Sequence, residues 1–305
     1  MLQVKSVDEV FQIISKEFSG YTPGTESVSI TDARGRILAE DIISSENVPP
    51  FNRSSVDGYA VYASDTFGAS ETMSSQLLKS ESVEMGITPK YPLKRGTAAY
   101  IPTGGELPQN ADAVVMIEYT EENNDEYIYI NKPVAPGNNV VLTGDDVKAG
   151  SIIFSSGKKL KTADIGVLAS IGIINVKVKR KLKVGIIATG DEIIPVEQKP
   201  VHAQVRDINS FLLYASLKEH GAEPVMYGII EDNYEKIKSA ADTALGECDI
   251  ICISGGSSAG EKDETVKIID SLGKPGVLVH GIAVKPGKPT IIGKAHNKPV
   301  IGLPG

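Results

Sequence analysis

The sequence predicts a multidomain protein in which a small β domain precedes an α/β domain with a mainly parallel sheet. The first observation is length, because 305 residues exceed the size of a usual single core. The second is a region between residues 51 and 138 in which short β-branched and aromatic segments alternate with Gly, Pro and Asn turns. The third is a β-α-β-α alternation beyond Arg180, which is typical of a parallel sheet with helices on both faces.

The first expected element is a helix that begins after Ser6. Ser6 and Glu9 form a capping box ahead of an apolar stripe that continues to Gly20. A later helix is expected with Thr162 as its N-cap and Gly172 at its end. Strands of the β region are expected at 97–101, 113–117 and 127–130.

The α/β region has its own series of expected elements. Strands are expected at 182–188, 225–230, 250–254, 290–292 and 300–303, and helices at 210–220, 232–245 and 264–272. Asp232 and Glu235 have the spacing of a capping box, so Asp232 is expected to begin its helix. Its second carboxylate oxygen could still face a metal ion.

The stretch from Asp249 to Asp263, DIICISGGSSAGEKD, combines a buried strand, a glycine turn and a helix start. Gly255 and Gly256 break the strand, and Asp263 is the expected N-cap of the following helix. The first amides of a helix lack internal partners, so this order of elements can bind an anion. Tight packing alone could also require the glycines.

Polar residues gather where the expected parallel strands end, which is where ligands of such sheets bind. Thr189, Gly190 and Glu192 follow the first strand, and Pro304 follows the last. Two further acids stand in polar glycine turns: Asp57 in PPFNRSSVDGYAV and Asp146 in TGDD. Each could be a simple turn residue or part of a site.

Composition excludes several classes of protein. A net charge of -8 and a pI near 5.2 argue against a nucleic-acid surface. Apolar runs are far shorter than the roughly 20 residues of a membrane span. The only two cysteines, Cys248 and Cys252, fit a reducing cytoplasm, and core packing is favoured over a metal role for Cys252.

These pieces together resemble the molybdopterin molybdenumtransferase family, the MoeA proteins and the gephyrin E domain. The resemblance rests on motifs that occur in the family's order over nearly the whole chain. They are PPFNRSSVDGYAV, IPTGGELPQNADAVVMIE, TGDDV, ATGDEI, RDIN, SGGSSAGEKD, KPGKP and GLPG.

The resemblance implies an elongated N-terminal domain from residues 1–50 and 139–179, an inserted β domain at 51–138, and a MogA-like three-layer α/β domain at 180–305. The family's C-terminal β domain would be absent from this chain. A homodimer is implied, with the cleft between the α/β domain of one subunit and the inserted domain of the other.

The implied reaction converts adenylylated molybdopterin to molybdenum cofactor with molybdate and Mg²⁺ and releases AMP. A molybdopterin adenylyltransferase would be the upstream partner. By position in the motifs, the implied site residues are as follows. The catalytic ones are Asp57, Thr103, Asp146 and Glu192; the metal ligands are Asp207 and Asp232; the cofactor-binding ones are Thr189, Gly190, Ser254, Gly255, Gly256, Ser258, Asp263, Lys285, Lys288 and Pro304.

Three alternatives remain open at this point. Tungstate could replace molybdate, since both are tetrahedral dianions of similar size. A nucleotide pyrophosphatase like CinA shares a MogA-like domain, although its loop continues after the double glycine as Gly-Pro-Thr. A scaffold without catalysis, like gephyrin's E domain in receptor anchoring, would need only a partner-binding groove.

Overall fold

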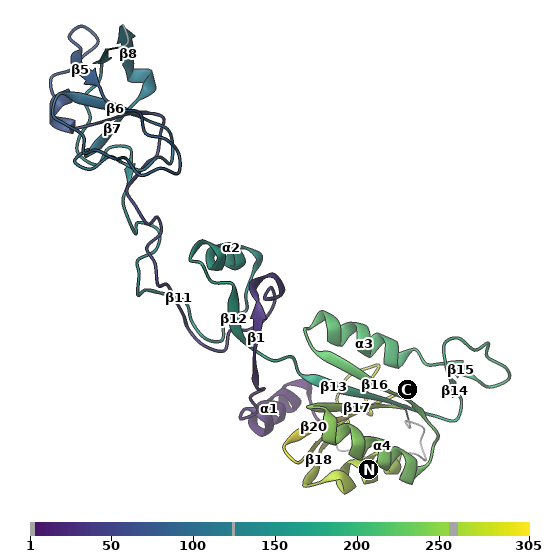
Figure 1. The fold of residues 1–305 in the computed structure, drawn as a ribbon. Coiled ribbons are helices and arrows are strands. Elements are labelled where there is room, and N and C mark those ends of the chain that lie inside the picture. The colour runs from purple at the N-terminus through teal and green to yellow at the C-terminus, as the bar shows by residue number, and fades with distance from the viewer. Residues whose placement is uncertain (1–3, 124–125, 256–261) are drawn as a thin grey trace. The chain divides into compact units, whose positions relative to one another are not determined.

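The computed structural model describes residues 4–123, 126–255 and 262–305, and the chain folds into two compact units (Figure 1). The α/β unit comprises Met1–Glu26 and Val178–Gly305, and the β unit comprises Ser27–Lys177. The finer division into three domains stays a prediction.

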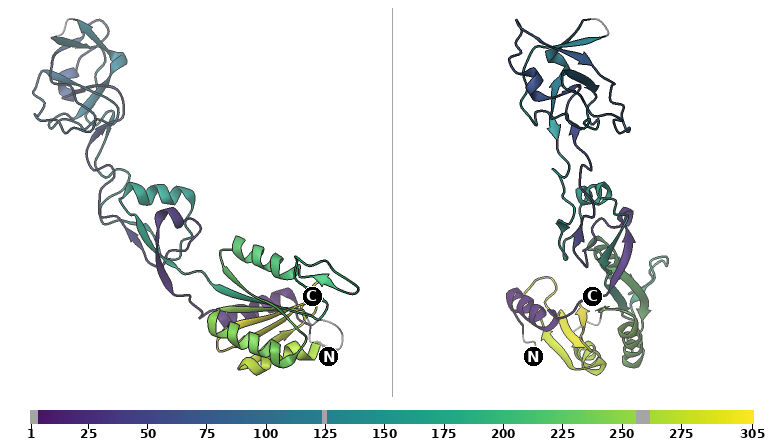
Figure 2. Two further views of the ribbon diagram at one scale, coloured as in Figure 1. Left: turned by 45° about the vertical axis from the view of Figure 1, so that its right-hand side comes forward. Right: turned by 60° about the vertical axis from the view of Figure 1, so that its left-hand side comes forward.

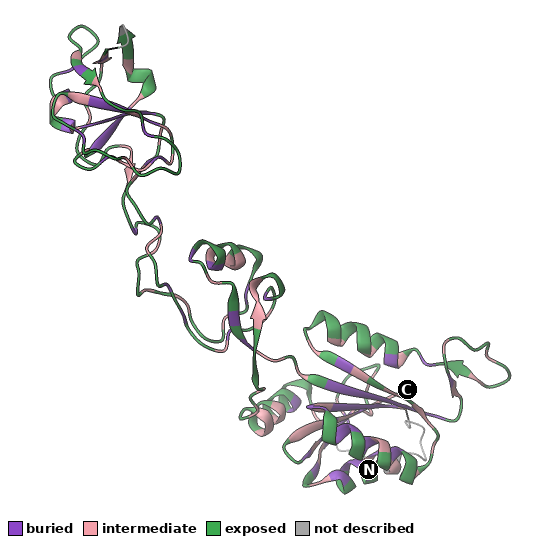
Figure 3. Cartoon of the chain, viewed as in Figure 1, coloured by how far each residue is buried: buried purple, intermediate pink, exposed green. Residues whose placement is uncertain are grey.

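The α/β unit is built on a six-stranded sheet. Its strands, in spatial order, are β16 (Glu223–Ile230), β13 (Lys183–Thr189), β17 (Ile250–Ser254), β20 (Lys298–Leu303), β19 (Ile291–Ala295) and β18 (Pro275–His280). β16, β13, β17 and β20 are parallel to one another, and β19 is antiparallel to both of its neighbours. Buried side chains dominate β13 and β17 (Figure 3). The predicted mainly parallel sheet is therefore confirmed.

Helices cover both faces of this sheet, as expected for three layers. The apolar sides of α4 (Tyr234–Glu247) and α5 (Lys262–Leu272) share one buried cluster with Ile291. Val10 of α1 (Val7–Phe18) packs against Val279 and Ile292. Because successive strand residues face opposite sides, α1 covers the face opposite α4 and α5. α3 (Asn209–Glu219) also lies on the side away from α4 (Figures 1 and 2).

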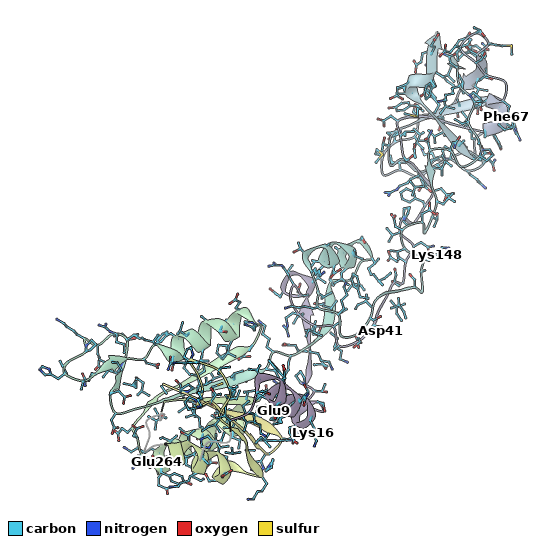
Figure 4. The ribbon with its side chains drawn as sticks, turned by 180° about the vertical axis from the view of Figure 1, so that it is seen from behind. Glu9, Lys16, Asp41, Phe67, Lys148 and Glu264 are labelled. Carbon is cyan, nitrogen blue, oxygen red and sulfur yellow. The ribbon has the colours of Figure 1, made fainter. Side chains whose placement is uncertain are left out.

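Both ends of α1 are fixed by polar contacts. The Ser6 hydroxyl accepts a hydrogen bond from the Glu9 amide at 3.3 Å, and the Glu9 carboxylate accepts one from the Ser6 amide at 2.7 Å. The predicted capping box is thus confirmed. At the other end, the Lys294 ammonium donates to the Glu17 carbonyl at 2.7 Å, which ties the helix to β19. Figure 4 labels Glu9 and Lys16 on this helix.

An ion pair between Arg180 and buried Asp249 joins the segment before β13 to the start of β17. Asp249 is 6% exposed and receives both terminal nitrogens of Arg180, at 2.5 and 2.6 Å. The Lys183 amide donates to the same carboxylate at 2.8 Å, and the Tyr21 hydroxyl donates to it as well. The Arg180 guanidinium, ahead of the other donors, holds the pKa of Asp249 well below its usual range.

The β unit contains a second six-stranded sheet with two buried clusters. In spatial order its strands are β7 (Ala113–Met116), β4 (Gly58–Val61), β6 (Thr97–Ile101), β5 (Ser75–Lys79), β9 (Tyr127–Ile130) and β8 (Thr120–Asn123). All neighbours are antiparallel except β5 and β6. The predicted strands at 97–101, 113–117 and 127–130 are confirmed as β6, β7 and β9.

Short elements complete the two units. The two-stranded sheets pair β1 (Thr25–Ser29) with β12 (Asn175–Lys179), β2 (Ile42–Ile43) with β11 (Ile152–Phe154), β3 (Arg53–Ser54) with β10 (Val140–Val141), and β14 (Ile193–Ile194) with β15 (Val205–Arg206). The remaining helices are α2 (Thr162–Ser170) and the 3-10 turns η1 (Ile30–Asp32), η2 (Ala63–Thr66) and η3 (Ile117–Tyr119). Within the described ranges, each helix is too short or too polar to cross a bilayer.

Three predicted helix starts differ from the structure. Lys161 is the N-cap of α2, so Thr162 is its first helical residue. α5 begins at Lys262, so Asp263 lies inside the helix, one residue after its start. α4 is capped by Asn233, whose side-chain oxygen accepts from the Lys236 amide at 3.1 Å, and not by Asp232. Asn and Asp are equally good caps, so the sequence alone does not choose between neighbours.

Candidate active site

A cavity of about 510 Å³ lies at the carboxyl edge of the parallel strands of the α/β unit. The ends of β13 and β17 and the segment after β16 form part of its lining. Its lining residues are Ala188, Thr189, Glu192, Ile193, Val205, Arg206, Asp207, Ile208, Asn209, Asp232, Ser254, Gly255 and Gly305. This is the edge at which parallel α/β sheets bind ligands.

Three acids line this cavity: Glu192, Asp207 and Asp232. Asp207 is only 7% exposed, and its carboxylate accepts a hydrogen bond from the Ser210 amide at 3.0 Å, in the first turn of α3. Asp232 is half-buried, and Glu192 is exposed. The N-cap of α4 is Asn233 and not Asp232.

The donor set suits a hard cation that a substrate helps to bind. Among the described residues, no three His, Cys, Asp or Glu side chains come close enough to hold a metal ion by themselves. Mg²⁺ in proteins often takes one or two carboxylates and fills its remaining positions with water and substrate phosphate. Asp207 and Asp232 in one cavity fit that pattern, so the residues present are compatible with Mg²⁺.

Glycine allows the chain to pass very closely at the cavity floor. A Cβ on Gly255 would lie 2.0 Å from the Thr189 carbonyl oxygen, and its φ of +124° disfavours other residues. A Cβ on Gly190 would lie 2.8 Å from a carboxylate oxygen of Glu192. Gly255 is therefore required for the close backbone approach, and at Gly190 a φ of +144° favours glycine. Thr189 and Ser254 are buried beside them, at 3% and 4% exposure.

Part of the predicted phosphate loop lies outside the described residues. Gly256 and Ser258 belong to that part, and the side chain of Asp263 does too. On α5, Glu264 borders a void of about 10 Å³ together with Thr189 and Asp232; Figure 4 labels it.

Lys285 and Lys288 do not line the cavity. They are exposed on the loop between β18 and β19, which lies at the same edge of the sheet because β18 runs parallel to β17. This loop is held by the N-terminal segment: the Lys5 amide donates to the Gly281 carbonyl at 3.0 Å, and the Ala283 amide donates to the Lys5 carbonyl at 2.8 Å. Pro304 follows β20 at this edge without lining the cavity.

In the β unit, two predicted residues meet directly. Asp57 lies in the bend before β4, and its carboxylate accepts hydrogen bonds from the Thr103 amide at 2.7 Å and the Thr103 hydroxyl at 3.0 Å. These bonds, the backbone one foremost, lower the pKa of Asp57. The carboxylate is exposed and ionised at neutral pH. Gly58 beside it must be glycine, because a Cβ would lie 1.9 Å from the Val115 carbonyl oxygen.

Asp146 lies in the predicted glycine turn, with an exposed carboxylate. Its amide donates to the Val48 carbonyl at 2.9 Å. The turn is also joined to the PPFN stretch, because the Asn52 side-chain oxygen accepts from the Thr143 amide at 2.8 Å. The TGDD and PPFNRSSVDGYAV motifs, far apart in sequence, are therefore neighbours in the fold.

Sequence reasoning missed several residues of the cavity. Arg206 and Asn209 flank Asp207 and Ile208 within RDIN, a motif that had already been singled out for its acid. Their place in the motif was a usable signal. Cys252, in contrast, is 5% exposed, and burial raises the pKa of its thiol to about 12. Its predicted role in core packing is confirmed.

Comparison with known proteins identifies the family. Residues 5–172 match the family model for the MoeA N-terminal region (domain I and II), and residues 185–305 match the model named "Probable molybdopterin binding domain". A molybdopterin biosynthesis protein of Methanocaldococcus jannaschii is 38% identical over 314 residues, covering 100% of this chain and 76% of that protein. A molybdopterin molybdenumtransferase of Haemophilus influenzae is 36% identical over 281 residues, covering 92% of this chain and 68% of that protein.

Solved structures agree. Two crystal structures of the molybdopterin biosynthesis MoeA protein from Pyrococcus horikoshii superimpose with TM-scores of 0.86 and 0.85, at 42% and 34% identity. They cover 99% of this chain and 75% and 74% of those chains. With a family model on more than half of the residues and a relative matched along the whole chain, this protein belongs to the MoeA family.

Proposed function

We propose that this protein is a molybdopterin molybdenumtransferase of molybdenum cofactor biosynthesis. In this proposal it uses molybdate and Mg²⁺ to convert adenylylated molybdopterin to molybdenum cofactor and releases AMP. The observation that carries the proposal is the convergence of Asp207 and Asp232, from two separate segments, on one cavity beside close-packed glycine turns. The name of the Haemophilus influenzae relative supports the same reaction.

The cavity residues have chemistry that suits these substrates. Asp207 and Asp232 would hold Mg²⁺, which when bound would neutralise negative charge on the phosphate groups. Ser254 and the backbone amides near Gly255 would bind phosphate oxygens. Lys285 and Lys288, on the loop at the same sheet edge, would attract molybdate by charge.

Asp57, Thr103, Asp146 and Glu192 are proposed as catalytic residues. Asp57 is ionised and held by Thr103, so it can stabilise positive charge without losing its position. The match of residues 5–172 to the MoeA N-terminal region favours the transferase over a CinA-like pyrophosphatase.

The test is AMP release from adenylylated molybdopterin by the full protein when molybdate is added. Asp232→Ala is expected to lower turnover at least about 100-fold, because a metal-binding carboxylate is lost. Asp242→Ala is the matched control, since Asp242 pairs with Lys238 on the exposed side of α4.

Each outcome decides something different. Unchanged turnover in Asp232→Ala would refute the metal assignment. No AMP release by the unaltered protein would refute the transferase, and hydrolysis of ADP-ribose without molybdate would favour the pyrophosphatase. Partner binding that survives in a protein without turnover would favour a scaffold. Metal analysis of the cofactor made with both oxyanions present decides between molybdate and tungstate.

We also propose a homodimer, supported by apolar side chains that α3 leaves exposed. Phe211 and Leu212 of α3 and its N-cap residue Ile208 are 48%, 63% and 64% exposed, at helical spacing. Light scattering of the protein in solution is expected to give a molar mass twice that of one chain. Leu212→Glu should shift it toward the monomer, whereas Lys218→Glu on the same helix should not.

The supply of substrate and the compartment are part of the proposal. An adenylylated substrate requires an adenylyltransferase upstream, which is the expected partner. The two cysteines are buried and unpaired, which supports a reducing compartment such as the cytoplasm.

A further inference from the structure

Asp191 makes a hydrogen bond that joins the segment after β13 to the segment after β16. It lies in the turn after β13, next to Glu192, and its carboxylate oxygen accepts from the Asp232 amide at 3.1 Å. Asp191 is exposed and does not line the cavity. Its contact is therefore with the backbone of a cavity residue.

A second bond fixes the same turn from the other side. The Gly190 amide donates to the Ile230 carbonyl, the last residue of β16, at 3.4 Å. The turn is also closed on itself, because the Ile193 amide donates to the Gly190 carbonyl at 3.1 Å. A glycine here leaves room for the Glu192 carboxylate. These bonds thus hold the ends of β13 and β16 together next to Asp232.

We propose that Asp191 is a positioning residue, which holds the backbone at Asp232 so that the Asp232 and Glu192 carboxylates keep their places around the cavity. This inference rests on the proposed metal role of Asp232. Asp191 acts through its acceptor oxygen and not through its charge.

The bond matters because it holds the backbone of a cavity residue just before α4 begins. Asp232 precedes the helix, whose first residue is Tyr234 and whose cap is Asn233. The helical hydrogen-bond ladder therefore does not hold its amide. Partners that orient metal ligands commonly change metal affinity about 10- to 100-fold when removed.

Two variants separate the acceptor from the charge. Asp191→Ala removes both, whereas Asp191→Asn keeps a side-chain oxygen at the same place and removes only the charge. Asp232→Ala serves as the variant without the ligand. Asp191 is exposed and Asp232 is half-buried. All three proteins are expected to fold, and thermal melting checks this.

Two measurements are made on the full protein. Hydrogen exchange of a peptide covering residues 229–234 reports the bond itself: Asp191→Ala should exchange about tenfold faster at the Asp232 amide, and Asp191→Asn about as slowly as the unaltered protein. Electron paramagnetic resonance of free Mn²⁺, a probe for the Mg²⁺ site, reports the consequence. The dissociation constant should rise about tenfold in Asp191→Ala and less than about threefold in Asp191→Asn.

The outcomes distinguish this inference from the proposed function. Equal exchange and equal Mn²⁺ affinity in Asp191→Ala and the unaltered protein would overturn the positioning role. An Asn variant as impaired as the Ala variant would overturn it too, because charge would then be the active property. No Mn²⁺ binding by the unaltered protein, together with faster exchange only in Asp191→Ala, would support the bond between Asp191 and the Asp232 amide. It would remove the metal part of the proposed function.

Discussion

Replacing Asp249 with alanine should destabilise the α/β unit more than any surface charge change. The substitution removes the acceptor of two Arg180 bonds, at 2.5 and 2.6 Å, and of the Lys183 amide bond at 2.8 Å. Breaking a buried ion pair on one side typically costs about 3–5 kcal/mol. The Arg180 side chain is 37% exposed and can be rehydrated, so we expect the lower end, about 3 kcal/mol.

The pH dependence gives a second signature. The folded-state pKa of Asp249 is lowered by Arg180, so its stabilisation is fully present above the unfolded pKa of about 3.9 and is lost as the pH falls through the folded pKa. The free-energy difference between the two proteins should therefore be constant from pH 5 to pH 8. It should shrink when the pH falls below about 4.

The assay is urea unfolding, monitored by hydrogen exchange of peptides from β13 and β17. These peptides report on the α/β unit alone. Asp242→Ala is the control, because its pair with Lys238 is exposed and should contribute no more than about 0.5 kcal/mol. An Asp249→Ala protein within about 1 kcal/mol of the unaltered one at pH 7 would refute the reasoning. A difference that persists unchanged at pH 3 would contradict the ionic part of it.

Three further predictions follow from single contacts. Lys5→Pro removes the amide that anchors the β18–β19 loop, so that loop should exchange hydrogen faster, whereas Lys5→Ala keeps the amide and should not differ. Gly255→Ala places a Cβ 2.0 Å from a β13 carbonyl oxygen and should lower the free energy of unfolding of the α/β unit by at least about 1–3 kcal/mol. The control is Gly246→Ala, which has open space around it and should not lower this free energy. Thr103→Val removes one donor to Asp57 and should raise the pKa of that carboxyl, as carboxyl NMR titration would show; an unchanged pKa would contradict the assigned cause.

Local signals in the sequence were sufficient for the elements that depend on local physics. The capping box at Ser6 needs only residues three apart, and the apolar run of β17 has the right length for a buried strand. The fold class followed from the alternation of such elements. Choosing between adjacent caps, Asp232 and Asn233, failed because both side chains satisfy the same requirement.

Elements that depend on distant partners could not be found in this way. β18 begins with Pro275 and contains Gly276, which normally argue against a strand. Both residues are tolerated because β18 is the edge strand of the sheet, a position that only the folded structure reveals. The bond between Asp191 and Asp232 likewise needs the strand order, since β13 and β16 are separated in sequence by α3.

The placement of α1 has a consequence for synthesis on the ribosome. Val10 packs against Ile292, a separation of about 280 residues, which at roughly 5–20 residues per second corresponds to about 15–60 s of translation. During that time the apolar side of α1 has no sheet to cover, while the β unit is completed first. Nascent-chain chaperones would therefore meet this amphipathic segment early and would have to release it only after β18 and β19 have been synthesised.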